Sequence, residues 1–503
     1  MKRILSSPVT ALAFGLALRL FFVLKHPANS GDTVIYEQIA ANWLKHHVYA
    51  MNVSGQPVPA DLRMPGYPAF LAFIYALSGK VGEAARLPVM LAQIFVDLLT
   101  CVAIASLAEA MNIAADLPSR NKRVFTVALW LAALCPFTAN YTAVALTEVF
   151  AIFFTALALL FFVRLSVETM GPAQNPAVNS RYIPRTPAAL AISAGLCVGL
   201  GTLFRPETPL LLVTAIFVYV VFFLKKEKLR HTATIVLLMC SAAILPLVPW
   251  AIRNYLTLHE IEMLAPRNSM LPGELDPVGF VSWEKTWLYR FRDCYLVPWK
   301  LNDEPINIDD LPSNALDSAE ERERVGAILD QYNEDLTLTP QEDSAFAQLA
   351  RERTARHPLR TYLWLPLRRS VRIWFTPRIE LLPISGNVFP LALMAEEDPV
   401  DQRVTIVLFF LNIVFVGLGI FGAIRLWPNR AARPVVALLA LYILLRTIFL
   451  STLETPEPRY VLVCFPALIA LAAQLFAPRK KIASDSAPKN PAATYLPAVQ
   501  DES

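Results

Sequence analysis

Apolar blocks of about twenty residues, separated by polar segments, recur along this chain of 503 residues. A helix of that length crosses a hydrocarbon core of about 30 Å. Charged residues make up only 17% of the chain and hydrophobic residues 55%, whereas soluble domains carry roughly 25% charged residues. The sequence therefore predicts an all-α polytopic membrane protein.

Reading the apolar blocks as helices predicts about ten membrane spans. They cover residues 8–25, 87–109, 124–140, 147–164, 188–203, 207–224, 232–252, 404–426, 434–452 and 459–477. The apolar run 65–78 is short for a span and opens with two prolines, so we interpret it as an interfacial or re-entrant helix. A true span there, which would invert the topology, is the alternative.

Lys and Arg residues concentrate in alternate connections, and such connections lie on the cytoplasmic side. They occur at the N-terminus, in 120–123, 181–185, 225–230 and 425–433, and in the tail from 479. This alternation predicts a multi-pass membrane protein with both termini in the cytoplasm. The two long loops, 26–86 and 256–403, then lie on the outer side.

The expected organisation has four parts. A transmembrane catalytic module (1–255) includes the first outer loop, with juxtamembrane helices; a small periplasmic region of mixed or irregular structure (256–403) holds helical stretches near 318–332 and 343–356. Further spans follow in 404–477, and a Pro-, Ala- and Ser-rich cytoplasmic tail (478–503) is expected to be disordered. The six cysteines are scattered, so no disulfide framework is implied. The basic residues form no continuous stripe, which excludes a nucleic-acid partner and leaves membrane lipids.

Ionisable residues gather at the outer ends of the predicted spans, where charge is costly and marks function by default. They are Asp32, Glu148, Arg205, Glu207, Arg253, Glu454, Glu457 and Arg459, with Tyr460 beside the last. Arginines on this side oppose the usual charge bias, and a lipid phosphate that they bind bidentately would explain them. The plainer alternatives are ion pairs at helix ends, a helix-dipole role for Glu148 and an N-cap role for Asp32.

Two further groups of ionisable residues, a pair inside the spans and the possible metal ligands, are expected to have other roles. Arg19 and Asp97, inside the first two spans, are expected to be structural partners in the bundle. No HExxH pattern occurs among the six histidines, so a metal site is only weakly indicated. A divalent cation would have Asp32 and Glu148 as its ligands if these two carboxylates meet.

Several short motifs in this order resemble one family. They are Gly31-Asp32 with Tyr36, RMPGYP (63–68), Thr147-Glu148, LFRPE (203–207), PWAIRN (249–254) and EPRY (457–460). Together they resemble the bacterial GT-C glycosyltransferases of the protein O-mannosyltransferase and aminoarabinose transferase group. The likeness covers residues 1–255 well and 358–477 more loosely, and 256–357 find no counterpart.

The resemblance implies a GT-C fold and an inverting transfer of a hexosyl or pentosyl group from a polyprenyl-phosphate donor to a hydroxyl of a lipid, glycan or protein acceptor. It also implies a bacterial inner-membrane protein whose outer side is the periplasm. By the same resemblance, Asp32 is the expected catalytic base, and Glu148 orients the acceptor or shares a metal. The expected substrate-binding residues are Tyr36, Arg63, Tyr67, Arg205, Glu207, Arg253, Arg459 and Tyr460. Arg63-Met64 stands where the aminoarabinose transferases carry an acidic–basic pair, which argues against their metal site and against lipid A as acceptor.

Two alternatives stay open at this point. A transporter or flippase of lipid-linked or anionic substrates would also have many spans and intramembrane charges. Against it, the chain shows no inverted repeat and its polar residues lie at outer helix ends. A ligase or polymerase of lipid-linked glycans would share the donor class and differ in the acceptor.

Overall fold

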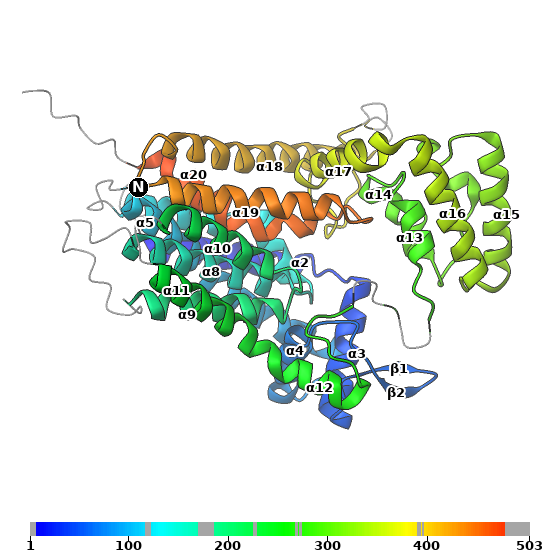
Figure 1. The fold of residues 1–503 in the computed structure, drawn as a ribbon, viewed down its shortest axis with the longest axis horizontal. Helices are drawn as coiled ribbons and strands as arrows, with labels where there is room; N and C mark the ends of the chain where they lie inside the picture. The colour runs from blue at the N-terminus through cyan, green and yellow to red at the C-terminus, as the bar shows by residue number, and fades with distance from the viewer. Residues whose placement is uncertain are drawn as a thin grey trace, which may run out of the picture.

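A computed structural model of the chain describes residues 7–115, 122–169, 186–224, 229–266, 270, 274–389, 394 and 397–477. The expected disordered tail (478–503) and most of the basic connections lie outside these residues. The long apolar helices run side by side in one bundle, and a smaller helical unit stands at one end of it (Figure 1). The protein is an all-α polytopic membrane protein, as predicted.

Seven helices of the described chain are long and apolar enough to cross a membrane. Four of them are single helices: α2 (Pro8–Lys25), α8 (Glu148–Thr169), α18 (Pro399–Leu426) and α19 (Arg433–Ser451). A fifth is α5 (Arg86–Ala114) together with the 3-10 turn η1 (Gly82–Ala85) that precedes it. The other two are composite: α11 (Leu229–Ile244) continues through η3 (Leu245–Leu247) into α12 (Val248–Leu258), and η9 (Pro458–Cys464) continues through α20 (Phe465–Ala473) into η10 (Gln474–Phe476). A pair bent by 50°, α6 (Arg123–Ala133) with α7 (Pro136–Ala139) and η2 (Asn140–Ala143), makes an eighth. The predicted spans 188–203 and 207–224 correspond to α9 (Pro187–Thr202) and α10 (Pro209–Phe223), apolar helices that are shorter than the seven candidate spans.

Proline and small residues shape this bundle. Pro136 begins α7 and cannot continue the hydrogen bonding of α6, so the chain bends there. Gly195 and Gly199 face α11, where a Cβ on either would run into the carbonyl oxygen of Met239 or Ala243. Without a hydrophobic force between helices in lipid, such close backbone contact is what holds them together.

The first loop forms a compact layer at one end of the bundle (Figure 1). It consists of α3 (Gly31–His46), the antiparallel hairpin β1 (Ala50–Val53) and β2 (Gln56–Pro59), and α4 (Gly66–Ser78). Ser54 and Gly55 have φ of 50° and 78°, the left-handed pair that a tight hairpin turn requires. The predicted short helix of 65–78 is therefore present as α4. Its first residue is tied to the bundle, because Gly66 N donates to Leu203 O at 2.7 Å.

The second loop contains a small helical unit with its own core. Its helices are α13 (Val278–Glu284), α14 (Phe291–Cys294), α15 (Ala319–Asp335) and α16 (Pro340–Arg356), with 3-10 turns at Pro298–Lys300, Ile308–Asp310 and Ser313–Ala315. In the core, the ring of Trp283 packs against those of Trp287 and Phe346. The two stretches expected to be helical correspond to α15 and α16. After this unit, a π-helical turn (Arg360–Trp364) leads into α17 (Leu365–Trp374), which packs against α19.

Arg19 and Asp97 form a buried ion pair between α2 and α5. Arg19 Nε donates to Asp97 Oδ2 at 2.5 Å, and its other nitrogens donate to Gly15 O, Ala133 O and Cys101 Sγ. Both side chains are almost fully buried, at 0% and 2% exposure. The expectation that they are structural partners agrees with this geometry.

Removing one partner of this pair is expected to leave an uncompensated charge inside the bundle. Arg19→Met should therefore destabilise the protein by about 3–5 kcal/mol, measured as earlier thermal unfolding in detergent. The double variant Arg19→Met/Asp97→Leu should recover most of that loss, because it buries no charge. Equal stability of the single variant and the wild-type protein would show that the pair is not needed.

Candidate functional site

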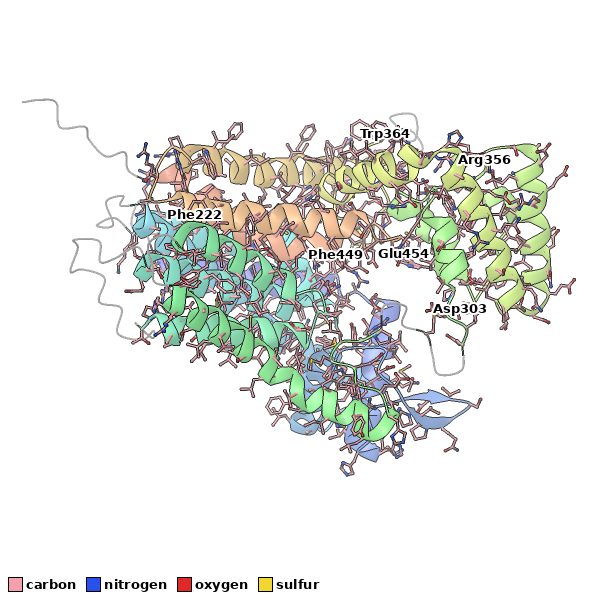
Figure 2. The ribbon with its side chains drawn as sticks, in the orientation of Figure 1. Phe222, Asp303, Arg356, Trp364, Phe449 and Glu454 are labelled. Atoms are coloured by element: carbon pink, nitrogen blue, oxygen red, sulfur yellow. The ribbon has the colours of Figure 1, made fainter. Side chains whose placement is uncertain are left out.

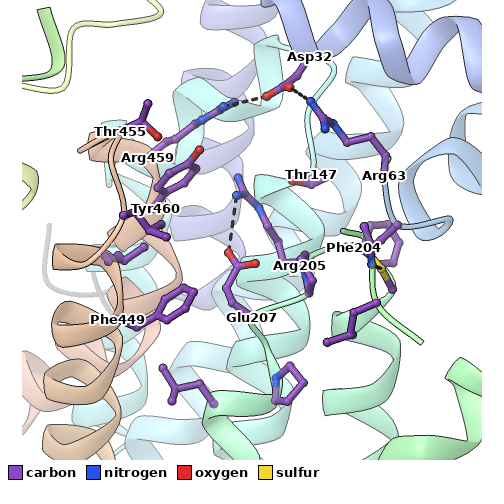
Figure 3. Close-up of a pocket in the computed structure, with 18 of the residues that line it drawn as sticks. Asp32, Arg63, Thr147, Phe204, Arg205, Glu207, Phe449, Thr455, Arg459 and Tyr460 are labelled. Carbon is purple, nitrogen blue, oxygen red and sulfur yellow. Dashed lines mark hydrogen bonds and ion pairs between the residues drawn. The ribbon is translucent and has the colours of Figure 1, made fainter. Parts of the chain in front are cut away.

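A cavity of about 770 Å³ opens where the first loop meets the ends of the bundle helices (Figure 3). Its wall combines ionisable side chains with apolar ones from α10 and α19. The residues that the sequence predicts and that line it are Asp32, Tyr36, Arg63, Arg205, Glu207, Arg459 and Tyr460. Segments from both halves of the chain thus contribute to a single site.

Asp32 lies in the first turn of α3, at the rim of the cavity. Its carboxylate is held from two sides: Arg63 donates to Oδ1 and Arg459 to Oδ2, both at 2.8 Å. The neighbouring Thr33 hydroxyl donates to Ala145 O at 3.1 Å and anchors this turn to the bundle. Burial alone would raise the pKa of Asp32, but the two guanidinium groups outweigh it and hold that pKa well below its usual range.

Below the rim, carboxylates and guanidinium groups alternate. Arg205 makes a hydrogen bond to Glu148 and lies 3.7 Å from Glu207, which in turn accepts from Arg446 at 2.9 Å. Arg459 links this row to the rim, because its Nε is 3.7 Å from Glu148 Oε1. Burial opposes ionisation of Glu207, but Arg446 and Arg205 lower its pKa overall. We call these residues, with Asp32, Arg63 and Glu457, the charge network.

Two tyrosines border the network. The Tyr460 hydroxyl donates to Glu457 Oε1 at 2.6 Å, and the guanidinium groups of Arg205 and Arg459 lie 5.1 and 5.4 Å from its ring centre. Tyr36 lies one turn after Asp32, and burial raises its pKa to about 12. Its hydroxyl therefore stays protonated at neutral pH, as a donor toward a ligand must.

Three of the predicted site residues do not line the cavity. Glu148 lies beneath it, only 2% exposed, as a partner of Arg205. Tyr67 points into the bundle and donates to Gln93 Oε1 at 2.7 Å. Arg253 stacks between the rings of Tyr49 and Trp250 and donates to the carbonyl oxygens of Ala60 and Tyr49, so it joins α12 to the hairpin. Tyr67 and Arg253, which the sequence predicts to bind substrate, therefore lie outside the lining of this cavity.

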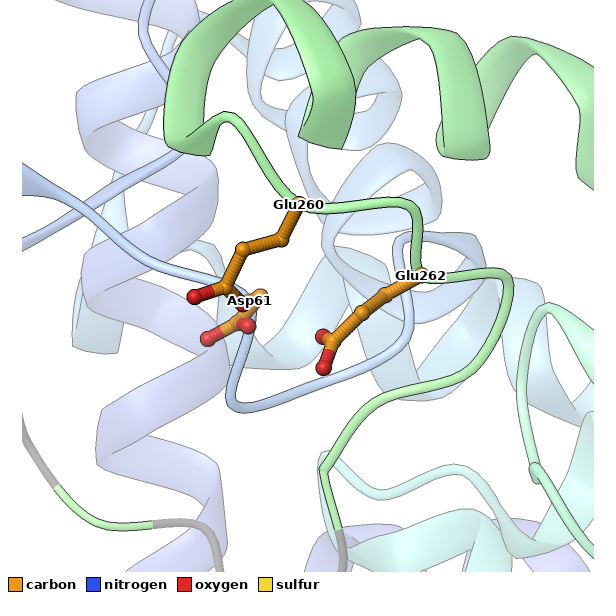
Figure 4. A group of neighbouring side chains, drawn as sticks. All are labelled: Asp61, Glu260 and Glu262. Atoms are coloured by element: carbon orange, nitrogen blue, oxygen red, sulfur yellow. The ribbon is translucent and has the colours of Figure 1, made fainter.

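A cation between Asp32 and Glu148 does not fit this arrangement. Arg459 pairs with both carboxylates. Arg63 makes a second ion pair with Asp32, and Arg205 makes one with Glu148. Within the described residues, the three-carboxylate group that could hold a metal ion is elsewhere, at Asp61, Glu260 and Glu262, whose ligand atoms lie within 4.8 Å of one another (Figure 4).

Two members of the network are absent from the predicted site residues. Arg446 lies in the middle of an apolar span and Glu457 just before one. Each carried a signal, since a charged residue within or beside a span is a functional candidate by default. Nothing in the sequence, however, tells that Arg446 faces Glu207 from a helix 239 residues away.

No protein-family model and no curated protein matches the chain. Similar solved structures include the oligosaccharyltransferase AglB of Archaeoglobus fulgidus, in complex with an inhibitory peptide and a dolichol-phosphate (14% identity, TM-score 0.48). They also include ArnT of Cupriavidus metallidurans, bound to undecaprenyl phosphate (15% identity, TM-score 0.36). The matches cover 92% of this chain, 50% of AglB and 77% of ArnT, so the chain spans about half the length of the oligosaccharyltransferase.

The different positions of the two tyrosines can be tested by removing each hydroxyl. Tyr67→Phe leaves the buried Gln93 carbonyl without its donor, which should cost about 1–3 kcal/mol of stability. The sequence motifs lead us to expect a polyprenyl-phosphate ligand, and the affinity of this variant for it, measured by fluorescence titration, should equal that of the wild-type protein. Tyr36→Phe should instead weaken that binding, and the opposite pattern would contradict the assignment.

Proposed function

We propose that this protein is an inverting glycosyltransferase that moves a sugar from a polyprenyl-phosphate donor to an acceptor hydroxyl at the outer face of the bacterial inner membrane. One observation carries the proposal. A carboxylate, Asp32, faces a cavity that offers arginines at one end and apolar side chains at the other. Such a cavity suits an amphiphile with a phosphate head, and the carboxylate supplies a base beside it.

The donor phosphate would bind to the arginines of the cavity. Arg63, Arg205 and Arg459 converge there from the first loop, the α9–α10 turn and η9 (Figure 3). Guanidinium groups pair bidentately with phosphate oxygens and keep their charge under all conditions. Phosphate affinity is therefore expected to depend on these three residues together.

The lipid tail has a path out of the cavity. Val213 of α10 lines it and is 58% exposed, and Phe217 and Val221 continue the same exposed row at spacings of four residues. On the facing α19, Phe449 lines the cavity and Leu444 and Ile448 are exposed nearby. A polyprenyl chain lying between these rows would stay in contact with the bilayer while its phosphate reaches the arginines.

The transfer itself needs one base and one stabilised leaving group. The acceptor oxygen attacks the anomeric carbon, its proton passes to Asp32, and the bond from that carbon to the phosphate oxygen breaks. The bonding electron pair stays on the lipid phosphate, where Arg205 and Arg459 would stabilise the charge. A positioned base of this kind contributes roughly 10²–10⁴ in rate.

Without ligand, Asp32 is a poor base, because Arg63 and Arg459 hold its pKa well below the usual range. A phosphate that draws Arg459 toward itself would remove one of these two cations from the carboxylate. The pKa of Asp32 would then rise toward its ordinary value and the carboxylate would accept a proton more readily. Donor binding would thus prepare the base for its task.

The base assignment is tested by Asp32→Asn. With a polyprenyl-phosphate sugar as donor, the variant should release polyprenyl phosphate at least about 100-fold more slowly, because the amide cannot take up the acceptor proton. Asp61→Asn, in the same loop but outside the cavity, is the matched control and should turn over at the wild-type rate. Full activity of Asp32→Asn would remove the assignment, and vesicle transport without turnover would identify a transporter.

The proposed sidedness can be tested at the two ends of α5. Lys80 lies just before this helix, while Asn429 binds Ala115 O at its far end. A helix of 29 residues is about 43 Å long, so the two positions lie on opposite sides of a bilayer. In a Cys240→Ser background, an impermeant maleimide on intact cells should label Lys80→Cys and should reach Arg430→Cys only after permeabilisation. The reverse result would invert the topology.

A further inference from the structure

A second cavity, of about 640 Å³, lies on the other side of the segment that carries Arg459. Pro456 and Pro458 of this segment line it, whereas Thr455 and Arg459 line the first cavity. The remaining wall comes from the start of α14, the end of α17 and the stretch 375–389. The proposed transfer makes no use of this cavity.

Three arginines form one side of the second cavity: Arg290, Arg292 and Arg372. In the described part of the chain, none of them makes an ion pair or a hydrogen bond to a carboxylate, and Arg290 Nε is buried without a hydrogen-bond partner. Burial and the neighbouring charge of Arg290 lower the pKa of Arg372, as expected for like charges held close together. The buried carboxylate of Asp293 lies within electrostatic reach of all three.

Two carboxylates also line this cavity, and both already have partners. Glu380 accepts from the Tyr141 hydroxyl at 2.9 Å, and burial raises its pKa, which favours its neutral form. Glu397 accepts from the Asn387 side chain. The arginines therefore retain hydrogen-bonding capacity that the carboxylates around them do not use.

Another part of the wall is apolar and leads to exposed side chains on the surface of the bundle. It contains Phe375 and Phe389, which are 40% and 55% exposed. Phe389 contacts Phe409 of α18, with ring centres 6.0 Å apart. Exposed apolar side chains continue along α18 at Val407, Phe410 and Val414.

From these two walls we infer that the second cavity binds a phosphate-bearing anionic lipid, with its head group on Arg290, Arg292 and Arg372 and its chains over Phe375, Phe389 and α18. A soluble anion would leave the apolar wall unused, and a neutral lipid would leave the arginines unpaired. The inference does not depend on the proposed transferase activity, because none of these residues lines the first cavity.

Native mass spectrometry of the full-length protein with phosphatidylglycerol tests the inference. The variant Arg290→Gln/Arg372→Gln should bind one lipid molecule fewer, or bind that lipid about tenfold more weakly, because two charged donors are lost. Arg322→Gln/Arg324→Gln, on α15 and outside the lining of the second cavity, removes the same charge and should bind as the wild-type protein does. Thermal unfolding of the two double variants checks that both are folded.

Three further binding measurements distinguish recognition of the lipid head group from recognition of its chains. Phosphatidylcholine, whose head group is zwitterionic, should not fill the site that phosphatidylglycerol fills. Inorganic phosphate should compete only weakly, since it lacks the chains. Phe375→Ser/Phe389→Ser should weaken phosphatidylglycerol binding and leave phosphate binding unchanged. Equal retention of both lipids, unchanged binding by the arginine variant, or displacement by phosphate at lipid-like concentrations would each overturn the inference.

Discussion

The alternation of arginines and carboxylates around Asp32 is the interaction on which the loop-bearing end of the helix bundle depends. Four arginines (Arg63, Arg205, Arg446 and Arg459) face four carboxylates (Asp32, Glu148, Glu207 and Glu457). They come from α3, the first loop, α8, the α9–α10 turn, α19 and η9, so the network joins segments from both halves of the chain. A network this deeply buried is a poor way to gain stability, since desolvation offsets most of the attraction. Its presence is better explained by what the site must bind.

The segment 454–460 connects this network to the rest of the molecule and separates the two cavities. Its prolines restrict the backbone, and the carbonyl of Pro458 accepts from Arg378, whose guanidinium also binds Asn412 of α18. The position of Arg459 is therefore fixed from the α18 side of the bundle as well as by its carboxylate partners. A lipid in the second cavity would contact this same segment through Pro456 and Pro458, directly behind Arg459.

The sequence predicts the elements of this fold better than the directions of its side chains. Apolar blocks identify the spans because burial in lipid requires them, and the length and prolines of 65–78 suffice to recognise α4. Side-chain direction depends on tertiary contacts: Tyr67 belongs to the same motif as Arg63 yet points to Gln93 inside the bundle. Arg253 likewise serves the hairpin, whereas Arg446, which resembles an isolated charge in a span, completes the network. The second cavity joins α14, α17 and 375–389, which no motif connects.

The equal numbers of arginines and carboxylates in the network bear on how a donor would enter the site. With no excess positive charge, a phosphate must compete with Asp32 or Glu148 for their guanidinium partners, so donor binding is an exchange of ion pairs. The proposed transfer then keeps the total charge constant. The phosphodiester donor carries one negative charge and the lipid phosphate product two, while Asp32 loses its charge as it takes the acceptor proton. In a site shielded from water, a step that moves charge between fixed partners and creates no new charge requires little reorganisation of the surrounding groups. This favours a mechanism in which Asp32 takes up the proton while the leaving phosphate gains the negative charge.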